Sequence, residues 1–169
     1  MKKEKIREIT YISLCVAIMA VLSQIAIPIG AVPLTIQAFV VSLIGYFLGV
    51  KRGVIAVTVY ILLGLVGMPV FASLQGGLHV LISYTGGFIF GYLPFVCLCG
   101  IKGSAWRSIA LGICGLLACH AVGVAQYMIL SELTFWGAFL AVSLPYLAKD
   151  VALVVAAYFV SKELKKKLK

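Results

Sequence analysis

The sequence has little charge, and its few acidic residues are outnumbered by basic ones. Only 11% of its 169 residues are charged, 5 of them acidic and 14 basic, while 63% are hydrophobic. Soluble globular domains carry about 25% charged residues, so this composition excludes a soluble domain. The mean hydropathy of +1.16 indicates the same class. We therefore expect an integral membrane protein.

The sequence also lacks the motifs of nucleotide-binding and hydrolytic proteins. It contains no G-x-x-x-x-G-K-[ST] loop, no G-x-S-x-G and no H-E-x-x-H. An intramembrane enzyme, such as a Ser-His protease or an acyltransferase, is disfavoured because His79 and His120 lack an evident nucleophile partner. We expect no catalytic residue and no cofactor.

The cysteines do not form a metal-binding pattern. They lie in apolar segments near no cluster of acidic residues or histidines, and a C-x-C pair on a helix directs its side chains about 200° apart. Two such ligands cannot close a tetrahedral metal site. We interpret the five as packing residues: Cys15, Cys97, Cys99, Cys114 and Cys119.

Long apolar runs are what the sequence has in quantity. In hydrocarbon every backbone group must be paired internally, and these runs are longer than the strands of a membrane barrel. The sequence predicts an all-α integral membrane bundle of six transmembrane helices in a single domain, residues 1–169. The first run follows a basic head, but it is too long for a secretory signal and has no cleavage site. The expected spans are about 9–27, 36–50, 53–72, 80–100, 107–130 and 135–161.

The basic residues are distributed unevenly between the expected connections. Residues 28–35, 73–79 and 131–134 contain no Lys or Arg. With six spans, thirteen of the fourteen basic residues lie on one side of the membrane, whereas five or seven spans would divide them. The positive-inside rule then predicts that both termini are cytoplasmic. We attribute the net charge of +9 to the membrane topology of the chain, and we expect no nucleic-acid partner. The thirteen are Lys2, Lys3, Lys5, Arg7, Lys51, Arg52, Lys102, Arg107, Lys162, Lys165, Lys166, Lys167 and Lys169.

The fourteenth basic residue, Lys149, lies beside Asp150 inside the last expected span. At 1.5 Å per residue from Lys162, both sit roughly 18–20 Å into the membrane, in the outer half of its core. Neighbours on a helix point about 100° apart, so we expect a poor self-neutralising pair and a separate partner for each. They either bond to other helices or form the polar wall of an outward-opening cavity. Pro145 predicts a helix break near Ser143.

A second group of polar and flexible residues lies in "GMPVFASLQGGLHVLISYTGGFIFGY", residues 67–92, on the expected outer side. Aromatic walls with a few fixed polar groups suit a small amphiphilic solute, although glycines at such spacing also serve helix packing. The segment from Pro28 repeats the pattern and is expected to dip into the outer mouth. His120 and Gln126 stay outside this prediction. The expected substrate-binding residues are Thr35, Gln37, Phe71, Gln75, Gly76, Gly77, Tyr84, Thr85, Gly86, Gly87, Tyr146, Lys149 and Asp150.

Four ordered blocks carry a resemblance to a known family. They are "VPLTIQ" at 32–37, "GVKRG" at 49–53, "GLVGMPVF" at 64–71 and "TGGFIFGY" at 85–92, with a Gly-Gly pair between the last two. The chain resembles the BioY family of biotin-binding membrane subunits. The resemblance implies the substrate-capture component of an energy-coupling factor transporter in the bacterial plasma membrane, which binds biotin on the outer side. It also implies a transmembrane scaffold subunit and two cytosolic ATPases as partners, with ATP hydrolysed by the latter.

The resemblance also implies roles for individual residues. Family members meet the scaffold through small residues on the first helix, for which Ser13 and Ala17 are the nearest match. The family's Lys three positions after the Asp is Leu153 here, and Lys149 precedes Asp150 instead. Asp150 can accept from the ureido N–H groups of biotin while Lys149 meets its carboxylate, or the reverse. Another vitamin-like solute, or a structural or proton-coupled membrane protein, remains an alternative.

Overall fold

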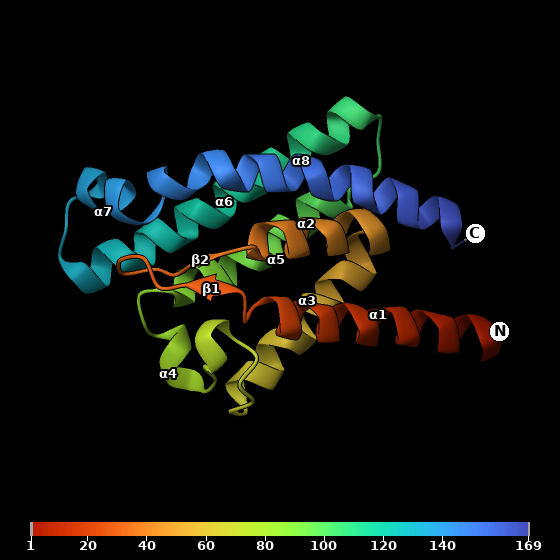
Figure 1. The fold of residues 1–169 in the computed structure, drawn as a ribbon, viewed down its shortest axis with the longest axis horizontal. Helices are drawn as coiled ribbons and strands as arrows, with labels where there is room; N and C mark the ends of the chain where they lie inside the picture. Colours follow the sequence, from red (N-terminus) through yellow and green to blue (C-terminus); the bar gives the residue numbers. More distant parts are fainter. Residues whose placement is uncertain (1, 169) are drawn as a thin grey trace.

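Helices make up most of the chain in the computed structural model, which describes residues 2–168 (Figure 1). The expected helical architecture is confirmed. Lys169, one of the basic residues counted above, lies outside the described residues. In chain order the elements are α1 (Lys2–Leu22), β1 (Ala26–Ile27), β2 (Leu34–Thr35), α2 (Gln37–Leu48), α3 (Val50–Leu65), the 3₁₀ turn η1 (Ala72–Leu74), α4 (Leu78–Leu81), α5 (Gly86–Gly100), α6 (Ala105–Ser131), α7 (Phe135–Val142) and α8 (Leu144–Lys167).

One correction to the all-α expectation is a short antiparallel hairpin between α1 and α2. Strands β1 and β2 pair Ala26 with Thr35 and Ile27 with Leu34. Pro28 and Pro33 lie in the connection, where a proline cannot continue a helix. Gly30 turns the chain with a φ of +76°, a conformation that glycine adopts without steric cost. The segment predicted to enter the outer mouth is therefore this hairpin.

Several helix ends differ from the predicted spans. Helix α1 begins at Lys2 because the charged residues ahead of the apolar run are good helix formers. Helix α3 ends at Leu65, well before the predicted residue 72, and is followed by Gly67 with a φ of +95°. Helix α5 begins only at Gly86, because the hydroxyl of Ser83 bonds the carbonyl of Val80 and competes with helical pairing.

The predicted break in the last span is confirmed at Ser143. Helix α7 ends at Val142, Ser143 has a φ of −125° and a ψ of −59°, and α8 begins at Leu144 with Pro145 in its first turn. Proline suits this position because the first N–H groups of a helix have no partner within it. The last predicted span is therefore divided into two helices of unequal length, α7 and α8.

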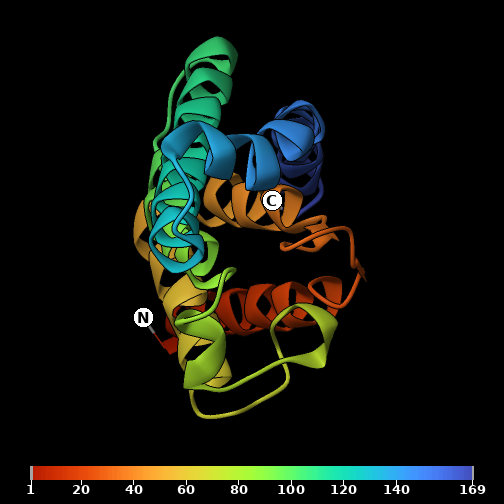
Figure 2. The ribbon, with the colours of Figure 1, turned by 90° about the vertical axis from the view of Figure 1, so that its left-hand side faces the viewer.

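Both chain ends lie at one end of the molecule, and the hairpin, α4 and α7 lie at the other (Figure 1). Figure 2 looks onto that other end and shows these three elements on different sides of it. Helices α6 and α8 are each long and apolar enough to cross a membrane. This arrangement agrees with the charge pattern, and the number of spans and the side of the termini stay predictions.

Helix α5 packs against α6 through small residues. A Cβ atom on Gly87 would lie 2.6 Å from the carbonyl oxygen of Val122, and one on Gly91 would lie 2.8 Å from Cα of Cys119. Glycines at this spacing let two backbones approach closely within a membrane. Close packing of α5 on α6 fixes the position of the residues that precede α5.

Candidate functional site

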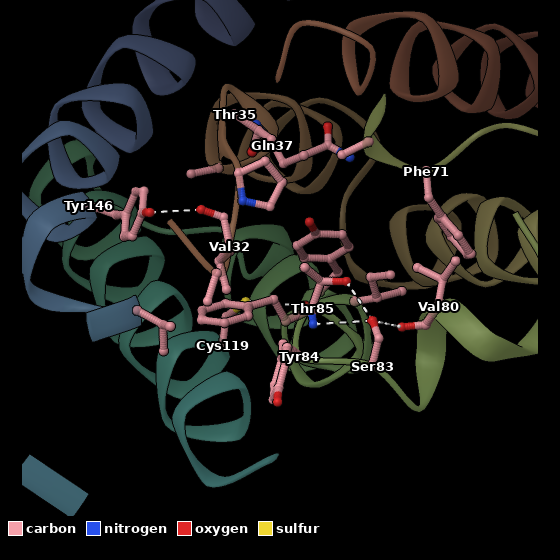
Figure 3. A pocket seen from close by; sticks show the side chains of 18 of the residues that line it. Val32, Thr35, Gln37, Phe71, Val80, Ser83, Tyr84, Thr85, Cys119 and Tyr146 are labelled. Carbon is pink, nitrogen blue, oxygen red and sulfur yellow. Dashed lines mark hydrogen bonds between the residues drawn. The ribbon is translucent and has the colours of Figure 1, made fainter. Parts of the chain in front are cut away.

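A cavity of about 390 Å³ opens at the end of the molecule formed by the hairpin, α4 and α7. Its volume falls within the range of about 300–1,000 Å³ that small-molecule sites occupy. Figure 3 shows side chains from many parts of the chain converging on it. Nine of the thirteen expected substrate-binding residues line this cavity: Thr35, Gln37, Phe71, Gln75, Tyr84, Thr85, Tyr146, Lys149 and Asp150.

The other four expected residues are glycines, and they do not line the cavity. A Cβ atom on Gly76 would lie 2.2 Å from the carbonyl oxygen of Met68, and one on Gly86 would lie 1.8 Å from that of Leu81. Gly87 packs on α6 as described, and Gly77 has a φ of +102°. These glycines therefore serve packing and turning, which is the alternative that the sequence left open.

Lys149 and Asp150 form an ion pair, which corrects the expectation that they would not face each other. The ammonium nitrogen Nζ lies 2.6 Å from Oδ1 of Asp150. The Cα–Cβ bonds of the two residues do diverge, but the four-carbon side chain of lysine is flexible enough to fold back to its neighbour. The same ammonium donates to the backbone carbonyl of Thr35 at 2.5 Å. The pair is thus internally neutralised and also bonded to the hairpin.

His120 is a cavity residue that the sequence prediction left out. It is buried, lines the cavity, and places Nε2 3.4 Å from Oδ2 of Asp150. Its other ring nitrogen, Nδ1, lies 2.9 Å from the hydroxyl of Ser143 at the helix break. The ring also meets Phe88 edge-on, with centroids 5.6 Å apart. His120 therefore connects the carboxylate of α8 to the break that precedes α8.

Gln126, also left outside the prediction, has a structural role. Its side-chain amide donates to the carbonyls of Leu81 and Ser83, at 2.8 and 2.7 Å. These carbonyls precede α5, and that of Ser83 also accepts from the backbone N–H of Gly86 at 3.1 Å. Gln126 holds the segment before α5 against α6 and does not line the cavity.

Helix α8 holds the hairpin over the cavity. The hydroxyl of Tyr146 lies 2.9 Å from the carbonyl oxygen of Ile29 and 2.7 Å from that of Val32, and Figure 3 shows Tyr146 directed at Val32. The bond from Lys149 to Thr35 fastens the second strand. Residues 28–35 supply six members of the cavity lining, so α8 is bonded directly to one wall of the cavity.

Gln37 carries a buried polar atom that has no partner in the described part of the chain. Its Nε2 donates to the hydroxyl of Tyr60 at 3.2 Å, and that hydroxyl donates its single proton to the carbonyl of Val70 at 2.9 Å. With its proton on Val70, Tyr60 accepts from Gln37, and Oε1 of Gln37 lies on the other side of the amide. Oε1 is buried and makes no hydrogen bond within residues 2–168. A buried acceptor left unpaired costs about 1–3 kcal/mol.

The remaining walls are mainly aromatic. Phe71 is buried and meets the ring of Tyr60 edge-on, with centroids 5.6 Å apart, while Phe88 and Tyr92 line another part of the cavity. Tyr84 is more exposed and packs on Tyr127. A cavity with aromatic walls, a neutral ion pair and a free amide oxygen suits a compact solute with both apolar and N–H-bearing parts.

The two residues expected to meet a scaffold do not line the cavity. Ser13 and Ala17 are both exposed on α1, one turn apart, and Val21 continues the same exposed face. Small exposed residues at this spacing permit close contact with another helix. The structure holds only this chain, so their partner stays a prediction.

Comparison with known proteins gives a consistent result. The chain matches the BioY family over residues 1–169. It is 40% identical over 123 residues to the "Biotin transporter BioY" of Thermotoga maritima, covering 70% of this chain and 72% of that protein. It is 33% identical over 161 residues to the "Probable biotin transporter BioY" of Pyrococcus horikoshii, covering 95% and 97%.

A solved structure shares the fold. The crystal structure of "the S-component for biotin from an ECF-type ABC transporter" superposes with a TM-score of 0.92 and covers 98% of this chain and 94% of that one. The sequence identity is 22%, so this likeness concerns the fold.

Proposed function

This chain belongs to the BioY family, and from that premise we propose that it captures biotin at the outer face of the bacterial plasma membrane for an energy-coupling factor transporter. The family consists of transport proteins, so the chain is not an enzyme. The observation that carries the proposal is the match over residues 1–169, together with a cavity lined by nine of the expected residues.

The cavity supports biotin through its chemistry. Biotin has a ureido group with two N–H donors and one carbonyl, an apolar thioether ring and a carboxylate tail. The ring fits the aromatic walls formed by Phe71, Phe88 and Tyr92. The ureido group needs acceptors for its N–H groups and a donor for its carbonyl, and the cavity offers both.

We place the ureido group, rather than the carboxylate, at Lys149 and Asp150. The two charges already neutralise each other at 2.6 Å, so adding the carboxylate of biotin would leave an uncompensated negative charge there. A lysine ammonium has three donors, of which two are directed at Asp150 and Thr35. The third can bond the ureido carbonyl, and Oδ2 of Asp150 can accept a ureido N–H. The tail then extends toward the mouth of the cavity.

Transport requires partners, because the chain lacks a nucleotide-binding loop. We propose that α1 meets the scaffold subunit through Ser13 and Ala17 and that two cytosolic ATPases supply the energy. The bundle is then oriented with six spans, α7 and α8 together forming the sixth, and with both termini in the cytoplasm.

An uptake assay tests this proposal. Cells that make the chain together with an energy-coupling module should accumulate labelled biotin, and a Walker-lysine variant of the ATPases should abolish accumulation. Binding of biotin without uptake would contradict the coupling. Uptake of a different vitamin would contradict the substrate.

A further inference from the structure

We infer that Gln37 determines specificity by accepting one ureido N–H of the ligand through Oε1. The inference rests on the proposed biotin function and concerns one atom of the same cavity. Gln37 is only 4% exposed and lines the cavity at the start of α2. Its Oε1 is the buried side-chain polar atom that lacks a hydrogen bond within residues 2–168.

The orientation of the amide follows from the neighbouring hydrogen bonds. The hydroxyl of Tyr60 gives its proton to the carbonyl of Val70, so its oxygen accepts from Nε2 of Gln37. Nε2 is therefore used by Tyr60, and Oε1 is the group of the amide that is left unpaired within residues 2–168. An unpaired amide oxygen is an acceptor, which selects a donor on the ligand.

Gln37 also belongs to the same polar region as the ion pair. Its backbone N–H lies 3.4 Å from the hydroxyl of Thr35, and the carbonyl of Thr35 accepts from Lys149. The cavity therefore presents two acceptors, from Gln37 and Asp150, and one ammonium donor in one connected region. A ureido group has the complementary set of two N–H donors and one carbonyl.

This assignment predicts that the cavity binds biotin more tightly than analogues of the same shape that lack one N–H group. An analogue in which an N–H of the ring is replaced by oxygen, a cyclic carbamate, brings an oxygen toward Oε1 and leaves that acceptor unpaired. Sites built to bond an N–H reject such isosteres because their own buried polar group is then left without a partner. The isomer with the other N–H replaced leaves the bond to Gln37 intact.

The test is a double cycle between Gln37→Met and the two carbamate isomers of biotin, measured by equilibrium binding to the purified protein. Methionine has nearly the volume of glutamine and no amide. We expect the isomer that places oxygen at Gln37 to bind wild type about 10- to 100-fold more weakly than biotin, whereas Gln37→Met binds that isomer and biotin alike. The penalty for the other isomer, which places oxygen at Asp150, should be the same in both proteins. Gln37→Met itself should lose a similar factor for biotin.

Ser42→Ala is the matched control, because it removes a buried hydroxyl from the same helix that bonds only carbonyls of that helix. Its biotin affinity should equal that of wild type. If Gln37→Met does not fold, Gln37→Asn withdraws the oxygen by one methylene and gives the same comparison.

Two results would overturn the inference. They are full biotin affinity in Gln37→Met, and penalties for both isomers that are the same in Gln37→Met as in wild type. Wild type that binds no biotin would instead overturn the proposed function itself, so the two failures are distinguishable.

Discussion

Lys149 and Asp150, neighbours in sequence on α8, form an ion pair with 2.6 Å between Nζ and Oδ1. A charged pair inside a membrane bundle is costly unless each charge is satisfied, and here the carboxylate also has His120 nearby and the ammonium has a backbone carbonyl. The pair is therefore a neutral, hydrogen-bonding element of the cavity wall.

The first prediction concerns Lys149→Met. Loss of the ammonium leaves Asp150 without its closest partner, so the free energy of unfolding in detergent should fall by about 1–3 kcal/mol. Biotin and biotin amide should lose affinity by the same factor, because the proposed contact is to the ureido carbonyl that both ligands share. Equilibrium binding of both ligands to both proteins measures this.

Lys162→Met, near the C-terminal end of the same helix, is the control and should bind both ligands as wild type does. A much larger loss for biotin than for its amide would show that Lys149 meets the carboxylate, against the arrangement proposed above.

A second prediction concerns the contact between His120 and Ser143. Their hydrogen bond is buried, so the variants His120→Phe and Ser143→Ala should each destabilise the protein. The double variant should lose less than the sum of the two single losses, by about 0.5–1.5 kcal/mol. Thermal or chemical unfolding of the four proteins gives the coupling energy, and strictly additive losses would mean that the contact does not stabilise the break.

The third prediction tests whether α8 keeps the hairpin closed. Tyr146→Phe removes the hydroxyl that donates to the hairpin carbonyls of Ile29 and Val32, which share its single proton, while retaining the ring, so bound biotin should dissociate about 2- to 10-fold faster. Stopped-flow competition measures the dissociation rate. Tyr158→Phe, on the same helix but outside the cavity, should leave the rate unchanged. An unchanged rate in Tyr146→Phe would mean that the hairpin does not limit release.

The fourth prediction concerns topology. Single cysteines at Gln75 and Lys165, in a background without the five native cysteines, lie at opposite ends of the bundle. A membrane-impermeant thiol reagent should label Gln75→Cys in intact cells and Lys165→Cys only after permeabilisation. Labelling of both positions in intact cells would contradict the six-span arrangement with cytoplasmic termini.

Much of the architecture could be predicted from local signals in the sequence. The apolar runs locate the helices, the prolines at 28 and 33 exclude a regular helix between α1 and α2, and Pro145 locates the break at Ser143. These features depend on the backbone chemistry of a few adjacent residues. The polar residues expected on the outer side were also identified from short segments of sequence, and most of them line the cavity.

The contacts between helices could not be predicted in this way. Local sequence patterns do not determine how α6 and α8 are rotated about their axes or shifted along each other. His120 could therefore not be placed beside Asp150. The pairing of Lys149 with Asp150 depends on one flexible side chain, which an ideal helical wheel omits. Gly76 and Gly86 were expected at the ligand, although the space that each leaves is filled by a neighbouring backbone carbonyl.

Isothermal titration of the purified protein in detergent with biotin tests the central claim most directly. The account predicts saturable binding of one biotin per chain at micromolar or lower concentration, with no need for a metal ion or a nucleotide. No binding at micromolar biotin, with binding of riboflavin or thiamine in its place, would contradict the account.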